Sequence, residues 1–511
     1  MFIKSSLLFS TLTFISRIFG FIRDVLIASF FGTTFYADAF TIAFRLPNLF
    51  RSTFAEGAFS AAFVPIFSKK LLHEGKEKAL HFASNIFGIL TISLIIIIIL
   101  LEVFMPTVVE AIAPGFKEDP YKFELTIFLT RITTPYLFFV SLVAFYSCIL
   151  NSINKFFALA FSPILLNITM ILGLYIVGKG QLDKVIVAAW TVFIGGIIQL
   201  LVIVKTIINK EVFPVIKKPK LDEADIKRFF RNLTPAFLSS SVTQLNIWIG
   251  TIIATSLSGA ASMIYFADRI VQLPTSLVGV SIGIVILPSL SKAIKGEEYE
   301  KANFLQNRAI EIALVLSLPC LVATIMLAKP IVYILFQRGE FSTLDTLKTA
   351  PALLTLAIGI PAYVINKIMV SNFFANEETK TPLKISIVCL VLNVIGNLIL
   401  IRYLEYVGIT LSTALVGWLN ALLLVVFSYR KKIFKFDYVI KIKFLKMCLS
   451  CVFLYLFLGA SLSFFEKYIY SSSKFLSLTS FFGIIIGAVL VYFFALSATK
   501  TYSLDEIKRL F

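Results

Sequence analysis

Two apolar segments that carry an unusual number of charges occupy residues 17–70, which read RIFGFIRDVLIASFFGTTFYADAFTIAFRLPNLFRSTFAEGAFSAAFVPIFSKK. Each segment is long enough to cross a membrane as a helix. A Lys, Arg or Asp at the centre of such a helix costs roughly 2.5–3.5 kcal/mol on insertion scales, so it is retained where it faces a wet cavity or another charge. The pattern therefore predicts a substrate or ion pathway. The charged residues of the two segments are Arg17, Arg23, Asp24, Asp38, Arg45, Arg51 and Glu56.

The composition of the whole chain is typical of a membrane protein. Of its 511 residues, 58% are apolar and 15% are charged, and the mean hydropathy is +0.92. A soluble protein of this length would need far more polar surface. Windows of roughly 20 apolar residues predict about fourteen spans, and the expected fold class is an all-α polytopic membrane protein. The predicted spans are 5–31, 35–67, 84–108, 124–150, 156–177, 185–208, 229–257, 261–290, 308–336, 347–374, 383–402, 408–428, 439–464 and 475–498.

Basic residues outside the spans predict the orientation of the chain. Lys and Arg concentrate in the 69–78, 205–231, 292–308 and 430–446 loops, which are therefore expected in the cytoplasm together with both termini. No signal-peptide cleavage site is evident, so the first span is expected to be retained. The formal charge of +18 then reflects topology and contact with anionic lipid head groups rather than nucleic acid binding.

An internal repeat indicates how the spans are organised. Two copies in the same orientation predict two parallel six-helix lobes, which hold substrate between them and expose it to alternate sides. The expected divisions are an N-terminal lobe at 1–208, a connector at 209–228, a C-terminal lobe at 229–430, and two additional helices with a tail at 431–511. The motif Ala37-Asp38, Leu46-Pro47, Val64-Pro65, Ser68-Lys69 recurs as Ala267-Asp268, Leu273-Pro274, Leu287-Pro288, Ser291-Lys292.

Arginines outnumber acids at membrane depth in the two copies of the repeat. Pairing of Arg with Asp or Glu, which would only hold helices together, leaves this surplus unexplained. The planar guanidinium binds phosphate or carboxylate through two parallel hydrogen bonds and keeps its charge when buried, so a diphosphate is a natural substrate group. At about 100° per residue, Asp38, Arg45 and Glu56 share one stripe of the second helix, although Pro47 can kink that helix.

Enzymatic chemistry and metal binding find little support in the sequence. Its five cysteines lack metal or disulfide spacing, and its two histidines, His73 and His81, flank a charged loop. Residues 173–180 (GLYIVGKG) resemble a phosphate-binding loop, but Gly180 replaces the required Ser or Thr and no strand precedes the loop. We expect a transporter without a cofactor or a bound metal.

Four charged motifs of the first two spans resemble the MurJ (MviN) family of lipid II flippases. The resemblance implies the fold of the multidrug, oligosaccharidyl-lipid and polysaccharide (MOP) exporter superfamily. It also implies transport of undecaprenyl-diphosphate-linked peptidoglycan precursor to the outer leaflet of the bacterial cytoplasmic (inner) membrane. The motifs are residues 16–24 (SRIFGFIRD), 37–40 (ADAF), 45–51 (RLPNLFR) and 54–59 (FAEGAF).

By motif match, the resemblance places the cavity arginines of the family at Arg17, Arg23, Arg51 and Arg269, and its acids at Asp38 and Glu56. The full set expected to bind substrate also includes Ser16, Asp24, Arg45 and Asp268. The family further uses its last two helices as a groove for the lipid tail. Some members bind sodium, whereas here the eleventh span has no acid and the available amides are Asn366, Asn393 and Asn397.

Three alternatives remain open at this point. A flippase for another polyprenyl-diphosphate-linked polysaccharide would need a similar cavity, while a cation-coupled multidrug exporter would be expected to have an acidic one. A non-transporting scaffold would not need arginines at membrane depth.

The membrane potential is a possible energy source for transport. Outward movement of an anion is favoured by about 2.3 kcal/mol per charge per 100 mV, so membrane potential can drive the cycle. Expected partners are lipid II and membrane lipids, with cell wall synthesis proteins as further candidates, and we expect a monomer.

Overall fold

Helices are the regular elements throughout the part of the chain that the structure describes. The computed structural model describes residues 2–52, 59–153, 155, 157–176, 180–214, 222–471 and 473–502. Apolar segments of this length become helices because hydrocarbon offers no partners for backbone N–H and C=O groups, and a helix satisfies these groups within one segment. The predicted all-α fold class is confirmed.

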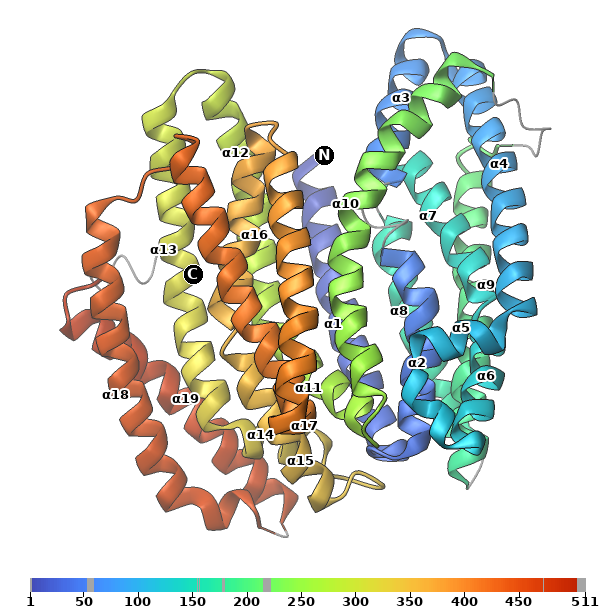
Figure 1. Cartoon of the computed structure of the whole chain (residues 1–511). Coiled ribbons are helices and arrows are strands. Elements are labelled where there is room, and N and C mark those ends of the chain that lie inside the picture. The colour runs from blue at the N-terminus through green and yellow to red at the C-terminus, as the bar shows by residue number, and fades with distance from the viewer. Residues whose placement is uncertain are drawn as a thin grey trace. The chain divides into compact units, whose positions relative to one another are not determined.

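Packing divides the chain into two units, of which unit 1 comprises Met1–Ser262 and Gly339–Phe341. In this unit α1 packs against α8, α8 against α9, and α2 against α6 (Figure 1). The helices are α1 (Phe2–Phe31), α2 (Phe35–Phe50), α3 (Phe59–His73), α4 (Lys76–Val103), α5 (Met105–Ile112), the 3₁₀ helix η2 (Pro114–Glu118), α6 (Pro120–Thr133), α7 (Tyr136–Ser152), α8 (Phe157–Ile176), α9 (Gln181–Ile208) and α10 (Ala224–Ala254).

Unit 2 comprises Met263–Arg338 and Ser342–Phe511. The last two helices of the chain pack against each other, and the first of them also packs against α13. The helix α11 (Ala260–Pro274) starts in unit 1 and continues in unit 2. The remaining helices are the π-helix η3 (Thr275–Val280), α12 (Ser281–Lys295), α13 (Tyr299–Met326), α14 (Ala328–Phe336), α15 (Thr343–Ala357), α16 (Ile360–Ala375), α17 (Lys380–Arg430), α18 (Tyr438–Ile469) and α19 (Lys474–Ala498).

The number of membrane spans stays a prediction. By length and composition, seven helical segments among the described residues can cross a membrane, or up to eight if the bent pair α15 and α16 counts as one span. One of the seven is α17, which is 51 residues long and covers the predicted spans 383–402 and 408–428. Its backbone leaves helical geometry at Glu405, and the Ser412 hydroxyl donates to the Asn393 side chain at 3.0 Å. The two halves of α17 therefore fold back on each other.

Both copies of the internal repeat interrupt a helix in the same way. In the first copy, α2 contains Pro47 and gives way to π-helical geometry at Arg51 and Ser52. In the second copy, α11 ends at Pro274 and continues as the π-helix η3. Proline removes a backbone donor, and π-bulges frequently occur at functional sites. The interruption therefore indicates that these helices take part in function as well as crossing the membrane.

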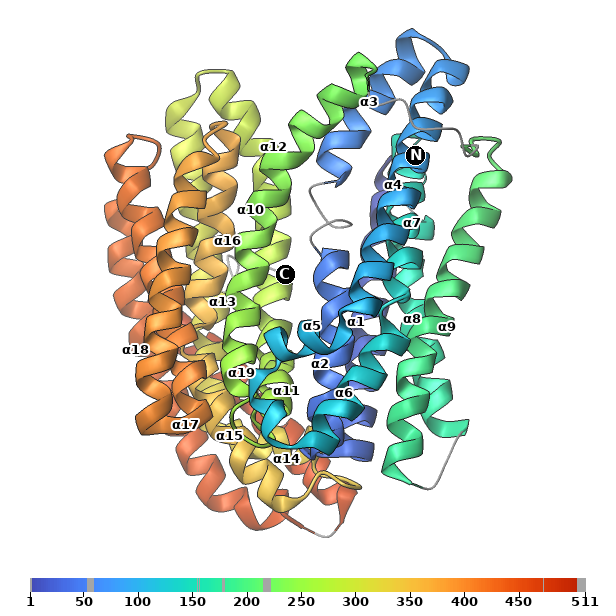
Figure 2. The same ribbon diagram turned by 45° about the vertical axis from the view of Figure 1, so that its right-hand side comes forward.

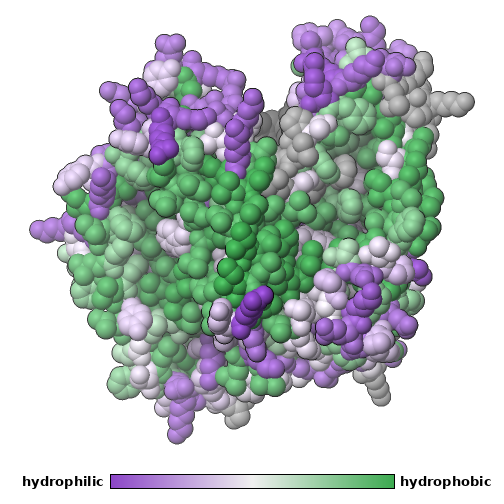
Figure 3. Space-filling view, viewed as in Figure 1, coloured by the Kyte–Doolittle hydropathy of each residue, from purple (hydrophilic) through white to green (hydrophobic). Residues whose placement is uncertain are grey.

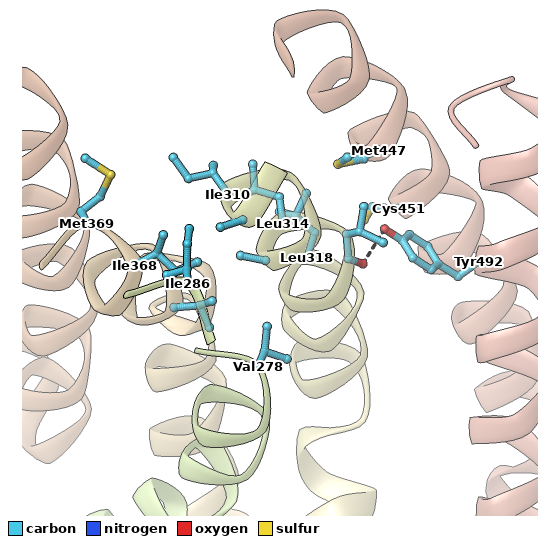
Figure 4. Packing of buried hydrophobic residues seen from close by; sticks show 14 of the residues in the cluster. Val278, Ile286, Ile310, Leu314, Leu318, Ile368, Met369, Met447, Cys451 and Tyr492 are labelled. Carbon is cyan, nitrogen blue, oxygen red and sulfur yellow. Dashed lines mark hydrogen bonds between the residues drawn. The ribbon is translucent and has the colours of Figure 1, made fainter. Parts of the chain in front are cut away.

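Each unit has its own hydrophobic core. In unit 1, Phe63 of α3 packs against Phe82 of α4 and Phe145 of α7, with ring centroids 5.5 Å apart in both pairs. In unit 2, helices α12, α13, α16, α18 and α19 enclose a cluster that includes Leu314 and Tyr492 (Figure 4). The Tyr492 hydroxyl donates to the Val315 carbonyl at 2.9 Å, which satisfies a polar group in an apolar interior.

The outer surface of each unit matches the predicted membrane environment. On the face shown in Figure 3, apolar side chains cover the sides of the helices and hydrophilic side chains gather near the helix ends. Large apolar residues are exposed along single helices, for example Ile96 and Ile99 of α4 and Phe453 of α18. Such exposure is stable in lipid, where apolar side chains are not in contact with water.

The helix α10 belongs to different parts of the molecule in the two divisions, the predicted lobes and the observed packing units. This helix contains the first span of the predicted C-terminal lobe, yet it packs against α3 in unit 1 (Figure 2). An ion pair of 2.6 Å between Lys70 and Asp225 and a ring contact between Phe59 and Phe229 join the two helices. The predicted lobes at 1–208 and 229–430, the connector at 209–228 and the segment at 431–511 stay predictions.

Candidate functional site

Arg23 and Asp24 form a buried ion pair on α1. The Nε and one terminal nitrogen of Arg23 donate to the same Asp24 oxygen at 3.0 and 2.7 Å. The other terminal nitrogen donates to the Asn167 side chain of α8 at 2.9 Å, and the Phe44 ring lies 5.3 Å from the guanidinium carbon. Arg23 is 6% exposed and Asp24 is 2% exposed. Such a pair is retained at membrane depth because each charge is compensated.

Arg17 and Ser16 lie one to two turns before this pair on α1. The Ser16 carbonyl accepts a hydrogen bond of 3.2 Å from the Asn167 amide. The Arg17 side chain is half-buried and makes no hydrogen bond or ion pair within the described ranges. A guanidinium in this state keeps its donors available for an anionic ligand.

Asp38 lies at the centre of a second cluster in unit 1. The local sequence explains the position of its cationic partner, because the Asp119 side chain caps α6 by accepting from the Lys122 backbone N–H, and Pro120 occupies the first turn. Lys122 Nζ then lies 2.7 Å from Asp38 and 3.9 Å from the centre of the Phe116 ring. Asp38 is completely buried, and Lys122 is 5% exposed.

The same carboxylate also caps the start of α11. Its two oxygens accept from the backbone N–H groups of Gly259 and Ser262, each at 2.9 Å. The first N–H groups of a helix have no intrahelical partner, and a negative charge beside them is favourable. Asp38 therefore joins α2, α6 and α11 within unit 1.

Two further arginines lie on or just after α2. Arg45 is half-buried and donates to the Thr251 hydroxyl of α10. Arg45 contacts α10, and Asp38 contacts the start of α11, the next helix along the chain. The two side chains therefore lie on the same side of α2. Arg51, also half-buried, donates through Nε to the Asn48 side chain at 3.2 Å. Glu56, the third predicted member of the stripe, lies outside the described residues.

The second copy of the repeat forms its own polar group in unit 2. Asp268 accepts from Gln272, which in turn accepts from Arg269 at 3.2 Å. The Arg269 guanidinium carbon lies 4.7 Å from the centre of the Tyr265 ring. Both charged residues are half-buried. Unlike Asp38, Asp268 is therefore coupled to its neighbours on the same helix.

The amides considered for sodium also lie in unit 2. Asn366 donates to the Gly417 carbonyl at 3.2 Å, Asn393 accepts from Ser412, and Asn397 is completely buried. Among the described residues, no group of three or more His, Cys, Asp or Glu side chains could hold a metal ion. The side-chain oxygens of these amides are neutral, whereas hard cations are usually held by carboxylates as well.

Sequence reasoning missed two residues of these clusters. Lys122 falls just before the predicted span 124–150, so the sequence pattern does not place it among the charges at membrane depth. The Asp119-Pro120 capping pair was the available signal that a helix starts before it. Asn167 is a single amide within an apolar helix (FALAFSPILLNITMILGLYI), a pattern that offers no partner by itself.

The clusters bring together some of the predicted residues and leave others apart. Arg23 meets Asp24, and Asp38 meets Lys122 instead of an arginine. The contacts described for Arg17, Arg45 and Arg51 do not join these three side chains to one another. The arrangement offers several half-buried guanidinium groups for an anion.

Comparison with known proteins shows the same family along almost the whole chain. The family model described as lipid II flippase MurJ matches residues 27–479. A protein of Rickettsia prowazekii named probable lipid II flippase MurJ is 39% identical over 504 residues, which cover 98% of this chain and 99% of the relative. A protein of Burkholderia cenocepacia named lipid II flippase MurJ is 35% identical over 82% of both chains.

Solved structures agree with this assignment. A structure titled lipid II flippase MurJ, inward closed conformation, is 29% identical, covers 96% of this chain and 98% of that chain, and superposes with a TM-score of 0.81. An inward-facing multidrug resistance MATE transporter of the MOP superfamily has a TM-score of 0.70 at 17% identity, covers 84% of this chain and 98% of that chain, and thus shares the fold alone. The chain therefore belongs to the MurJ family.

Proposed function

We propose that this chain is a transporter that moves lipid II, the undecaprenyl-diphosphate-linked peptidoglycan precursor, from the inner to the outer leaflet of the bacterial cytoplasmic membrane. The family match over residues 27–479 supports the substrate. The half-buried arginines Arg17, Arg45, Arg51 and Arg269 support recognition of a diphosphate, because guanidinium groups bind phosphate bidentately. The basic loops support a cytoplasmic location of both termini.

Within this proposal the site residues have different roles. Arg17, Arg51 and Arg269 bind the anionic head group, and Arg45, Ser16 and Glu56 belong to the same proposed set of substrate-binding residues. Arg23 and Asp24 form an exchangeable pair. Asp38 holds together the elements that carry Arg45, and Asp268 is linked to Arg269 through Gln272 on the same helix. The transporter works by alternating access as a monomer, and the last two helices hold the lipid tail.

A cellular assay tests the proposed function. The chain is depleted from its bacterial host, and an externally added enzyme that cleaves the head group measures how much precursor is accessible. Wild type, Arg51→Ala and Arg131→Ala are supplied back in turn. Arg131 is the matched control, since its guanidinium is half-exposed beside Glu102, 3.9 Å away.

The proposal expects access to fall on depletion and to return with wild type and Arg131→Ala, but not with Arg51→Ala. Unchanged access on depletion would show that peptidoglycan precursor is the wrong substrate, and a polysaccharide flippase or drug exporter would then be favoured. Full rescue by Arg51→Ala would remove this arginine from the site.

A further inference from the structure

Asn167 is the contact that α8 makes with the charged face of α1. It is 6% exposed, and it reaches two positions on α1 that are seven residues apart, the Ser16 carbonyl and the Arg23 guanidinium. Residues seven apart lie on the same helix face. The helices are close at this point, because a Cβ atom on Gly20 would lie 3.4 Å from the Asn167 amide nitrogen.

The two partners fix the orientation of the Asn167 amide. A guanidinium can only donate, so the amide oxygen must face Arg23. A backbone carbonyl can only accept, so the amide nitrogen must face Ser16. The reversed amide would lose both bonds. Asn167 is thus held in one orientation with its acceptor aimed at Arg23.

The guanidinium of Arg23 has two edges with different partners. One terminal nitrogen is held by Asn167 at 2.9 Å. The opposite edge, made of Nε and the other terminal nitrogen, donates to a single Asp24 oxygen. Two N–H groups side by side form the geometry that binds phosphate through parallel hydrogen bonds. Asp24 therefore occupies the edge of Arg23 that is best suited to an anion.

We propose that Asn167 is a positioning residue for Arg23. It holds one edge of the guanidinium while the opposite edge exchanges Asp24 for the diphosphate of the substrate. The inference rests on the proposed function, which supplies the diphosphate. A neutral amide suits this role, because it satisfies a buried donor without cancelling the charge that attracts the anion. A carboxylate at 167 would cancel that charge and lose the donor to Ser16.

The test measures binding of a soluble probe to the purified full-length chain in detergent. The probe is a short-chain lipid II analogue with the head group linked through diphosphate, titrated by calorimetry. Asn167→Leu should weaken its binding about tenfold, as expected when a buried charged group loses a hydrogen bond. Asn167→Asp should weaken it at least as much. Asp24→Asn should tighten it, because the internal competitor loses its charge.

Asn85→Leu is the matched control, since Asn85 is a buried asparagine of the same unit on α4. It should change thermal stability without changing probe affinity. Equal affinity of wild type, Asn167→Leu and Asn167→Asp would overturn the positioning role while the proposed function stands. A folded wild-type chain that does not bind the probe would overturn the proposed function together with this inference. If Asn167→Leu fails to fold, two other variants still test the positioning role. The isosteric Asn167→Asp should lower the affinity for the probe, and Asp24→Asn should raise it.

Discussion

Asp38 and Lys122 are single residues on which three helices of unit 1 depend. The carboxylate accepts hydrogen bonds from Lys122 Nζ and from two backbone N–H groups at the start of α11. Each of these donors is buried and would be costly to leave without an acceptor. The residue that the charge pattern assigned to substrate thus also has a structural task.

Removing the Asp38 charge should destabilise the protein strongly. Asp38→Asn leaves the Lys122 ammonium buried without a carboxylate, which typically costs about 3–5 kcal/mol when one partner of a buried pair is lost. Thermal unfolding in detergent measures the effect. Adding Lys122→Met to Asp38→Asn should restore much of the loss, although the capping bonds stay weakened. If the two single losses simply add in the double variant, the charges do not interact and the account of this pair fails.

The sequence identified the charged residues but not their partners. Asp38, Arg23 and Arg45 are unusual because a charge at membrane depth is costly, and this is visible in one sequence. Lys122 and Asn167 contact them from positions 84 and 144 residues away. Helical periodicity says which face a side chain occupies, but not which distant helix covers that face.

At the scale of elements, the turn between α16 and α17 is held by Glu378. Lys431, just after α17, donates to this carboxylate at 2.6 Å, and the backbone N–H and hydroxyl of Thr381 donate at 3.1 and 3.2 Å. The hydrogen bond from Lys431, followed by that from the Thr381 backbone, lowers the pKa of Glu378 from 4.5 to about 2. One carboxylate thus joins the start and the end of α17.

The stabilisation from Glu378 should depend on acid pH. Its pKa is lower in the folded chain than in the unfolded one, so the contribution is complete above about pH 4.5 and is lost as the pH falls toward about 2. Unfolding temperatures of wild type and Glu378→Gln should therefore differ at pH 6 and converge only near pH 2. Lys431→Met should behave like Glu378→Gln. A difference that stays constant with pH would contradict this assignment.

Helix locations were more predictable than helix interruptions. Apolar runs predicted α4, α9, α18 and α19 because a span requires length and hydropathy, both of which are visible in the sequence. The π-helical segments after Pro47 and Pro274 were not predicted as such, since proline indicates a kink but not its hydrogen-bond pattern. The turn at Glu405 lies in the gap between the predicted spans 383–402 and 408–428.

At the scale of the whole molecule, the internal repeat accounts for local structure better than for packing. Both copies place a helix, a π-helical segment and a second helix in the same order. Their acids nevertheless have different surroundings, since Asp38 is completely buried and Asp268 is half-buried beside Gln272. The helix α10 packs in unit 1 through Lys70 and Asp225, a contact that no repeat pattern predicts.

Membrane potential should drive the transport cycle. An inside-negative potential favours outward movement of an anionic head group by about 2.3 kcal/mol per charge per 100 mV. The same potential favours inward return of a cavity with surplus positive charge. Collapsing the potential in cells while ATP stays high should stop the appearance of precursor in the outer leaflet. Flipping at the normal rate without a potential would show that another energy source is used.

The most direct test of the central claim uses purified chain in sealed vesicles that contain lipid II in both leaflets. An added enzyme first removes the head groups of the outer leaflet, and the fraction that becomes accessible afterwards is followed over time. Vesicles with wild type are predicted to expose the protected lipid II, faster under an inside-negative potential, whereas empty vesicles and vesicles with Arg51→Ala stay protected. Protection in wild-type vesicles equal to that in empty vesicles would contradict the assignment of this chain as a lipid II flippase.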